Sequence, residues 1–155
     1  MTCIELETVI TAPVEICFDL SRSIELHQIS TASTKEKAIH GRTTGLCEKG
    51  DTITWRAKHF GIYQQLTVQI SEMNIPVFFE DRMVSGAFRS MRHRHYFTQT
   101  HGITLMKDIF EYEVPARVIG RIFDYLVLKN YMITLLLKRN QTIKDFAEGD
   151  WQAIL

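Results

Sequence analysis

The chain has 155 residues, of which 45% are hydrophobic and 23% are charged. This length and composition are typical of one globular domain over residues 1–155, and they exclude a fibrous repeat or a disordered chain. Eighteen Lys and Arg residues balance eighteen Asp and Glu residues, so no net charge attracts nucleic acid or an anionic membrane, and we expect neither as a partner.

The cysteines and the start of the chain indicate the cellular compartment. Cys3, Cys17 and Cys47 form an odd set whose spacings match neither a disulfide framework nor a zinc site, so we expect reduced thiols. The first residues lack the basic and apolar stretches of a signal peptide, which predicts a cytoplasmic protein. The most apolar window, residues 119–137, contains charged residues and Asn130. We therefore expect a core helix there and no integral membrane association.

The first thirty residues predict one strand and two short helices. Residues 3–11 alternate between apolar and polar side chains, as a half-buried strand does. Pro13 suits the first turn of a helix, and the apolar side chains that follow give that helix a buried side. A second short helix is expected over residues 23–29, although Ser23 lacks the carboxylate partner of a full capping box.

Six further strands follow, separated by turn residues such as Gly50, Gly61 and Gly102. Strands joined by such short turns should be antiparallel neighbours. After Pro115 the apolar residues recur every three or four positions, which predicts one long helix over residues 116–146 with Ile119, Phe123 and Leu126 on its buried stripe. The six predicted strands cover residues 37–40, 51–59, 62–73, 77–84, 91–98 and 103–114.

The element order and three local features carry a resemblance to a known family. The features are the entry from strand to helix at residues 10–13 with Val14 and Phe18, the stretch over residues 54–61, and the apolar C-terminal helix. In these the chain resembles the START and polyketide-cyclase superfamily (SRPBCC), which includes plant pathogenesis-related allergens, and most closely its small bacterial polyketide cyclase/dehydrase-like members. The resemblance implies an α+β helix-grip fold. In that fold a seven-stranded curved antiparallel sheet wraps around a long C-terminal helix, with two short helices between strands one and two. It also implies a ligand cavity between sheet and helix, but neither a particular reaction nor a cofactor.

Period-two alternation sorts the strand residues onto two faces of the sheet. The more apolar face should point inward, and it includes Ile62 and Val77. The outward set is charged and consists of Arg56, Lys58, Glu80, Arg82, Arg92, Arg94 and Lys107. From the inward set, the candidate ligand-binding residues are Trp55, His59, Gln64, Phe79, Asp81, Met83, His93, His95, Phe97, Met106, Asp108 and Phe110.

The polar members of the inward set need partners, because an unpaired buried polar group costs about 1–3 kcal/mol. We expect Asp81 and Asp108 to orient His93 or His95, and this cluster to hold a carbonyl or hydroxyl group of a ligand. The alternative is that these groups only bond to one another. His93-x-His95 with a nearby carboxylate could also complete a three-ligand metal site, but the spacing matches known ligand patterns only loosely, and we expect no metal.

Three functions are compatible with this pattern. We favour a non-catalytic binding or carrier protein for a small hydrophobic or amphipathic molecule, as a monomer or a homodimer. The first alternative is a cyclase, dehydrase or isomerase that acts on a polyketide-like carbonyl compound through acid–base chemistry of His93, His95, Asp81 and Asp108. The second alternative is a protein-interaction module whose cavity is vestigial.

Overall fold

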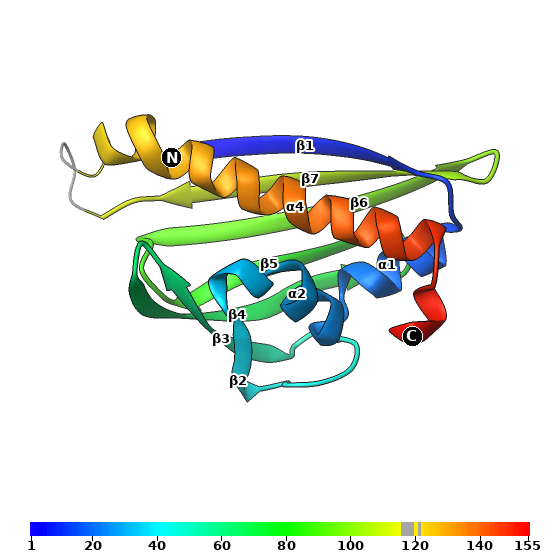
Figure 1. Ribbon diagram of the computed structural model, residues 1–155, viewed down its shortest axis with the longest axis horizontal. Helices are drawn as coiled ribbons and strands as arrows, with labels where there is room; N and C mark the ends of the chain where they lie inside the picture. The colour runs from blue at the N-terminus through cyan, green and yellow to red at the C-terminus, as the bar shows by residue number, and fades with distance from the viewer. Residues whose placement is uncertain (116–119, 121) are drawn as a thin grey trace.

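The computed structural model describes residues 1–115, 120 and 122–155, and it has the predicted helix-grip fold (Figure 1). Strand β1 is followed by two short α-helices and a 3-10 turn, and six more strands lead to the C-terminal helical region. The predicted helix start at residue 116 lies outside the described residues. The N-terminal elements are β1 (Thr2–Ile10), α1 (Val14–Ser21), α2 (Ile24–Ser30) and η1 (Ala32–Thr34).

The seven strands form one antiparallel sheet in the order β1-β7-β6-β5-β4-β3-β2. Each strand after β1 pairs with its neighbour in sequence, and β1 pairs with β7. The β3–β4 hairpin turns at Phe60-Gly61 and the β6–β7 hairpin at His101-Gly102, where all four residues have positive φ, as a two-residue I′ turn requires. The remaining strands are β2 (Lys37–Gly41), β3 (Thr52–His59), β4 (Ile62–Asn74), β5 (Phe78–Ser85), β6 (Ser90–Thr100) and β7 (Ile103–Glu113).

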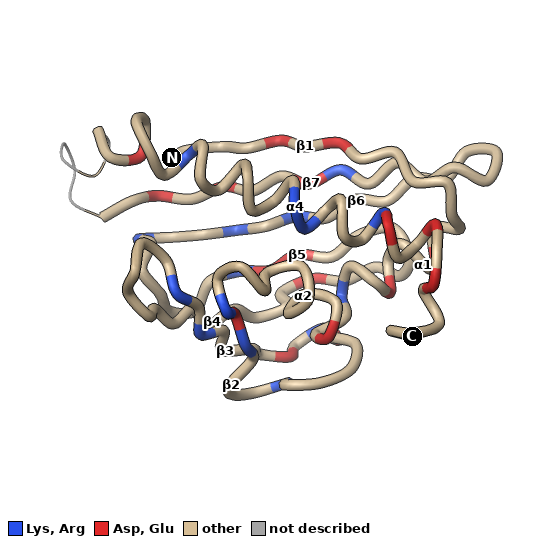
Figure 2. Tube along the Cα trace, in the orientation of Figure 1, with Lys and Arg blue, Asp and Glu red and all other residues tan. Residues whose placement is uncertain are grey.

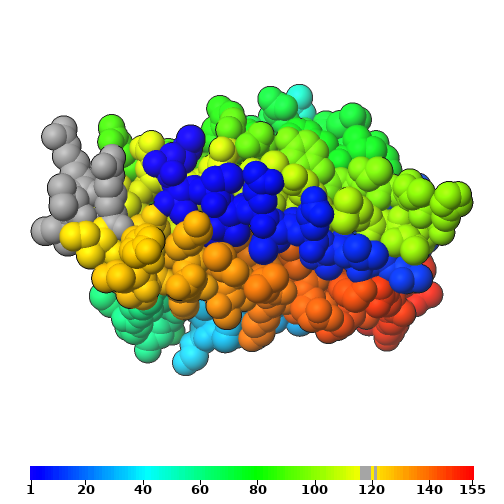
Figure 3. All heavy atoms as spheres, turned by 90° about the horizontal axis from the view of Figure 1, so that it is seen from above, coloured from blue at the N-terminus to red at the C-terminus, as the bar shows by residue number. Residues whose placement is uncertain are grey.

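The C-terminal helical region lies across the concave side of the sheet. It comprises the π-helical segment η2 (Asp124–Leu128), α4 (Lys129–Glu148) and the 3-10 turn η3 (Trp151–Ala153). Helix α4 contacts β1, α1 and α2, and Figure 3 shows the first strand and this helix side by side. Asp124 accepts hydrogen bonds from Thr2 and Tyr112, which ties η2 to β1 and β7. None of the helices in the described part of the chain is long and apolar enough to cross a membrane.

The first part of the predicted apolar stripe of this helix is exposed, contrary to expectation. Phe123 is 42% exposed and Leu126 is 63% exposed, whereas Leu136 and Ile143 farther along are buried. Ile119 lies outside the described residues. The π-helical turn explains part of the difference, because its i to i+5 hydrogen bonds break the 3.6-residue period from which the stripe was derived.

Three strand residues also differ from the predicted burial. Ile62 is exposed because it begins β4 at the tip of the β3–β4 hairpin, and Val77 is exposed because it precedes β5 in the connecting turn. Glu80 has the outward parity of Arg82 but is only 4% exposed. Its carboxylate accepts hydrogen bonds from Ser71 (2.8 Å) and Arg82 (3.1 Å), so neighbouring side chains on the convex face cover it.

The core divides into two apolar clusters along the sheet. In the first, which we call the filled half, Phe18 of α1 packs edge-on against Phe79 and Phe97 at ring distances of 5.5 and 5.3 Å. Ile10, Met106 and Ile143 belong to the same cluster. The second, which we call the hollow half, includes the buried residues Ile53, Trp55, Val68, Ile70, Met91, Phe110 and Leu136. The candidate functional site lies in the hollow half and at its border.

Candidate functional site

A pocket of about 400 Å³ lies in the hollow half, between the sheet and the C-terminal helix. That volume is within the roughly 300–1,000 Å³ range of small-molecule sites. Most of the wall is apolar: Ile53, Trp55 and Ala57 of β3, Val68 and Ile70 of β4, Met91 of β6, Phe110 of β7, and Met132, Leu135 and Leu136 of α4. The exposed lining residues Phe60, Ala87 and Phe123 mark the mouth. The concave sheet alone would leave these apolar side chains in water, and α4 covers them.

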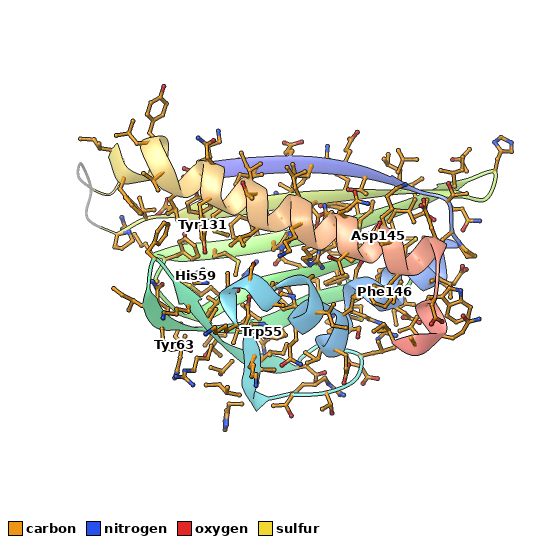
Figure 4. The ribbon with its side chains drawn as sticks, in the orientation of Figure 1. Trp55, His59, Tyr63, Tyr131, Asp145 and Phe146 are labelled. Atoms are coloured by element: carbon orange, nitrogen blue, oxygen red, sulfur yellow. The ribbon has the colours of Figure 1, made fainter. Side chains whose placement is uncertain are left out.

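One set of polar side chains, which we call the outer cluster, contains His27, Glu36, His59 and Tyr131, all of which line the pocket. His27 stacks on Trp55 with ring centroids 4.1 Å apart, and its Nε2 lies 3.4 Å from Glu36 Oε1. His59 Nδ1 is 2.8 Å from the Tyr131 hydroxyl oxygen, and Figure 4 shows these two side chains meeting between β3 and the C-terminal helix. The outer cluster thus joins α2, β3 and α4 around the pocket.

Burial and mutual charge shift the pKa values of the outer cluster. Burial lowers the pKa of His59, because the imidazolium form loses hydration. Burial opposes ionisation of Glu36, but the nearby His27 outweighs it and lowers the pKa of that carboxyl. Glu36 is therefore an anion at neutral pH beside the pocket.

A second set of polar side chains crosses the interior at the border between the two halves. We call it the polar layer; its members are Asp81 of β5, His93 and His95 of β6, Asp108 of β7, and Arg139 and Asn140 of α4. The antiparallel register places Asp81 opposite His93 and His95 opposite Asp108. Because side chains alternate between the two faces along each strand, Asp81, His93, His95 and Asp108 all lie on the inward face of the sheet.

Asp108 is the centre of the polar layer. His93 Nε2 lies 3.0 Å from Asp108 Oδ1, and His95 Nδ1 lies 2.7 Å from the same oxygen, without the alignment of a hydrogen bond. Asn140 Nδ2 donates to Asp108 Oδ2 at 2.7 Å, and Arg139 Nη1 is 3.6 Å from Oδ1. On its other side, His95 Nε2 is 3.1 Å from Asp81 Oδ2. Two strands and the helix are thus cross-linked through one buried carboxylate.

The pKa values of the polar layer follow from burial and this geometry. Burial opposes ionisation of Asp108, but the hydrogen bond from His93 and the close approach of His95 outweigh it and hold the pKa of Asp108 well below its usual range. The pKa of Asp81 is lowered in the same way, chiefly by His95. Burial, reinforced by His95, lowers the pKa of His93 to about 4. At neutral pH both carboxylates are ionised and the His93 ring is neutral.

Seven of the twelve predicted ligand-binding residues line the pocket: Trp55, His59, Gln64, Phe79, Asp81, His93 and Phe110. The other five do not lie on its wall. Phe97 and Met106 pack in the filled half, and Met83 packs against the cluster around the pocket. His95 and Asp108 lie behind His93 in the polar layer, so they act on the pocket through His93, Asp81 and Arg139.

Several residues at the pocket were not predicted from the sequence. Arg139 lines the pocket and donates from Nη2 to the Ser21 backbone oxygen at 3.0 Å. The sequence signal for this residue was Asn140, which occupies a position on the predicted buried stripe of the helix and has a charged neighbour. Polar and charged residues are unusual on the apolar face of a helix. Cys47 also lines the pocket, and burial raises the pKa of its thiol to about 12, so the thiol is protonated and a poor nucleophile.

Comparison with known proteins shows the fold alone. No family model matches the chain, and no curated protein matches its sequence. Solved structures do match. CV1439 from Chromobacterium violaceum is 12% identical with a TM-score of 0.73, covering 97% of this chain and 100% of that protein. A START superfamily protein from Mycobacterium smegmatis is 13% identical with a TM-score of 0.69, covering 99% of each chain.

A plant protein has the same architecture. Major latex-like protein 151 from Panax ginseng is 13% identical with a TM-score of 0.69, and the match covers 96% of this chain and 98% of that protein. The chain therefore shares its helix-grip fold with these proteins.

Proposed function

We propose that this protein binds a small hydrophobic or amphipathic molecule in the pocket between the sheet and α4. The observation that supports the proposal is a pocket of about 400 Å³ with an apolar wall and two separate groups of polar side chains. Apolar sites with a few convergent polar groups are the usual form of small-molecule sites. The same volume argues against a vestigial cavity, because close packing normally removes space of this size.

The positions of the polar groups define the ligand further. Arg139 and His93 stand at the inner end of the pocket, whereas His59, Tyr131 and Glu36 stand in the outer cluster. A ligand with an apolar body and a hydroxyl, carbonyl or carboxyl group at the inner end would contact the polar side chains at both ends of the pocket. Charged side chains of both signs are interspersed along the described chain (Figure 2), so the pocket rather than a one-sign surface is the recognition element.

Catalysis is the second candidate, and the His93–Asp108 pair is the observation that favours it. A neutral imidazole held by a carboxylate and facing a pocket is a common general-base arrangement. However, a pKa of about 4 makes His93 a weak base at neutral pH, since efficient general bases have pKa values near the working pH. We therefore place binding first.

The two tryptophans, Trp55 and Trp151, provide the test of binding. Trp55 is in the pocket wall, while Trp151 packs against the filled half. In a Trp151→Phe variant, titration with anilinonaphthalene sulfonate should change the Trp55 emission saturably. In the matched Trp55→Phe variant, the Trp151 emission should change less, because Trp151 lies outside the pocket wall.

A second pair of variants tests whether the mouth admits the probe. Ala87 is exposed at the mouth, and Ala153 is exposed outside the pocket. Ala87→Phe should weaken probe binding at least tenfold, while Ala153→Phe should leave it unchanged. Binding that is equal in both variants, or absent from the unaltered protein for every apolar probe and for molecules sought by native mass spectrometry, would overturn the proposal.

A further inference from the structure

Three side chains of the polar layer have the composition and spacing of a metal site. One donor atom from each of Asp81, His93 and His95 lies within 4.8 Å of the others. The 3.1 Å between His95 Nε2 and Asp81 Oδ2 is the separation of adjacent ligands around one ion, because bonds of about 2.0–2.2 Å at roughly 90–110° place ligand atoms about 3.0–3.5 Å apart. A metal could enter between these two atoms with little rearrangement.

The surroundings of the two imidazoles are those of metal-binding histidines. Such histidines almost always direct the ring nitrogen that is not on the metal toward a carboxylate or carbonyl. Asp108 stands in that position for both rings, next to His93 Nε2 and His95 Nδ1. Asp108 is itself held by Asn140 and by the Arg139 guanidinium. His95 Nε2 is left facing Asp81.

The charges of the polar layer favour the binding of a cation. Two carboxylates, Asp81 and Asp108, face one guanidinium, Arg139. With neutral imidazoles the layer carries a net negative charge in a buried place, which is costly unless a proton or a cation compensates it. A bound metal ion would balance this charge.

We propose that Asp81, His93 and His95 bind a divalent first-row transition metal ion, with Asp108 orienting both imidazoles. Two imidazoles and one carboxylate suit zinc, iron, cobalt or nickel rather than calcium or magnesium. Asp81 and His93 line the pocket, so the open coordination positions of the ion face the space where a ligand oxygen would lie. The inference is independent of the proposed binding of an apolar molecule, since the ion is held by the protein alone.

The test uses chelator-treated full-length protein titrated with Zn²⁺ by calorimetry and with Co²⁺ by visible absorption. We expect one ion per chain. Asp81→Asn and His95→Gln should each weaken Zn²⁺ binding at least 100-fold, and Asp108→Asn should weaken it about 10–100-fold, as is typical for a partner of metal-bound histidines. His40→Gln is the matched control, because His40 is an exposed histidine of β2 away from the layer, and it should bind Zn²⁺ as the unaltered protein does.

A measurement without substitutions keeps the test valid if a variant fails to fold. In nuclear magnetic resonance spectra of the imidazole nitrogens, one equivalent of Zn²⁺ should shift the signals of His93 and His95 and leave those of His40 and His101 in place. Absence of stoichiometric binding, or binding that the three variants do not weaken, would overturn the metal site and leave the layer as a closed ion-pair network. Because no apolar probe is present, this outcome is separate from failure of the pocket to bind one.

Discussion

The filled and hollow halves of the interior share one sheet and one helix, yet only one of them is closely packed. In the filled half, α1 inserts Phe18 between Phe79, Phe97 and the last turns of α4, and these side chains exclude water. In the hollow half, α2 and α4 cover the sheet without filling the space beneath them, and about 400 Å³ remains between Trp55, Phe110 and Leu136. The position of α1 therefore decides which end of the sheet becomes core and which becomes pocket.

The polar layer separates the two halves on β5, β6, β7 and α4. On α4, Arg139 and Asn140 stand between Leu136 of the hollow half and Ile143 of the filled half. On β7, Asp108 stands between Phe110 and Met106 in the same way. Charged groups that must pair inside a protein tolerate few alternative registers, so the layer can fix the helix along its axis while leaving the pocket open.

The largest expected effect comes from two matched truncations on α4. Ile143→Ala should lower the free energy of unfolding by about 3–5 kcal/mol, because Ile143 is enclosed and its removal creates a new cavity. Leu136→Ala, one heptad earlier, should cost less than about 2 kcal/mol, because Leu136 already faces a void. Urea denaturation followed by circular dichroism measures both losses.

The two truncations also differ in what they do to binding. Leu136→Ala should change the affinity for an apolar probe, and Ile143→Ala should not, once both proteins are folded. Equal losses of stability from the two changes would contradict the division into halves.

The next effect concerns the polar layer itself. Asn140→Ala removes the donor to Asp108 Oδ2 and leaves a buried carboxylate oxygen without its partner, which should cost about 2–3 kcal/mol. Gln141→Ala is the control, because Gln141 is exposed and bonds only to Asp145 one turn later, and it should change stability by less than about 0.5 kcal/mol. Both are measured in chelator-treated protein. A loss for Asn140→Ala as small as that of the control would mean that the layer does not hold the helix.

The strands and hairpins were predictable because their signals are local. Alternation along β6 placed Met91, His93, His95 and Phe97 on one face from the sequence alone, and the structure buries all four. The turns at Phe60-Gly61 and His101-Gly102 set the antiparallel order in the same way. Parity along a strand survives folding because each strand keeps its period of two.

What the sequence did not predict depends on where one element meets another. Arg139 reaches the pocket only because α4 crosses the sheet at that point, and nothing in a 3.6-residue period reveals such a crossing. Glu36 and Tyr131 join the outer cluster from segments almost a hundred residues apart in the chain. Ile62 is exposed at the tip of the β3–β4 hairpin, and Phe123 is exposed at the mouth of the pocket. The apolar character of Phe123 and Ile62 predicted burial, but whether a side chain is buried depends on which other elements cover it.

The smallest expected effect is an acid sensitivity of the hollow half that arises at His59. Because burial lowers the pKa of His59 in the folded protein, the unfolded chain binds a proton at this ring below about pH 6.5 that the folded chain does not bind. Folding stability from this group is therefore complete above that pH and falls as the solution becomes more acidic. The groups that face the ring are Tyr131, at 2.8 Å, and the carboxylate of Glu36, which opposes the shift.

His59→Phe should reduce the dependence of the free energy of unfolding on pH between about pH 7 and about pH 5, by no more than about 1.4 kcal/mol per pH unit. Tyr131→Phe is the matched control, since it removes the same hydrogen bond but keeps the imidazole. It should lower stability by about 1 kcal/mol at every pH and leave the slope as it is in the unaltered protein. Urea denaturation at several pH values measures both. If His59→Phe and Tyr131→Phe change the slope equally, the hydrogen bond rather than the buried ring is responsible, and the acid sensitivity does not arise from desolvation in the pocket wall.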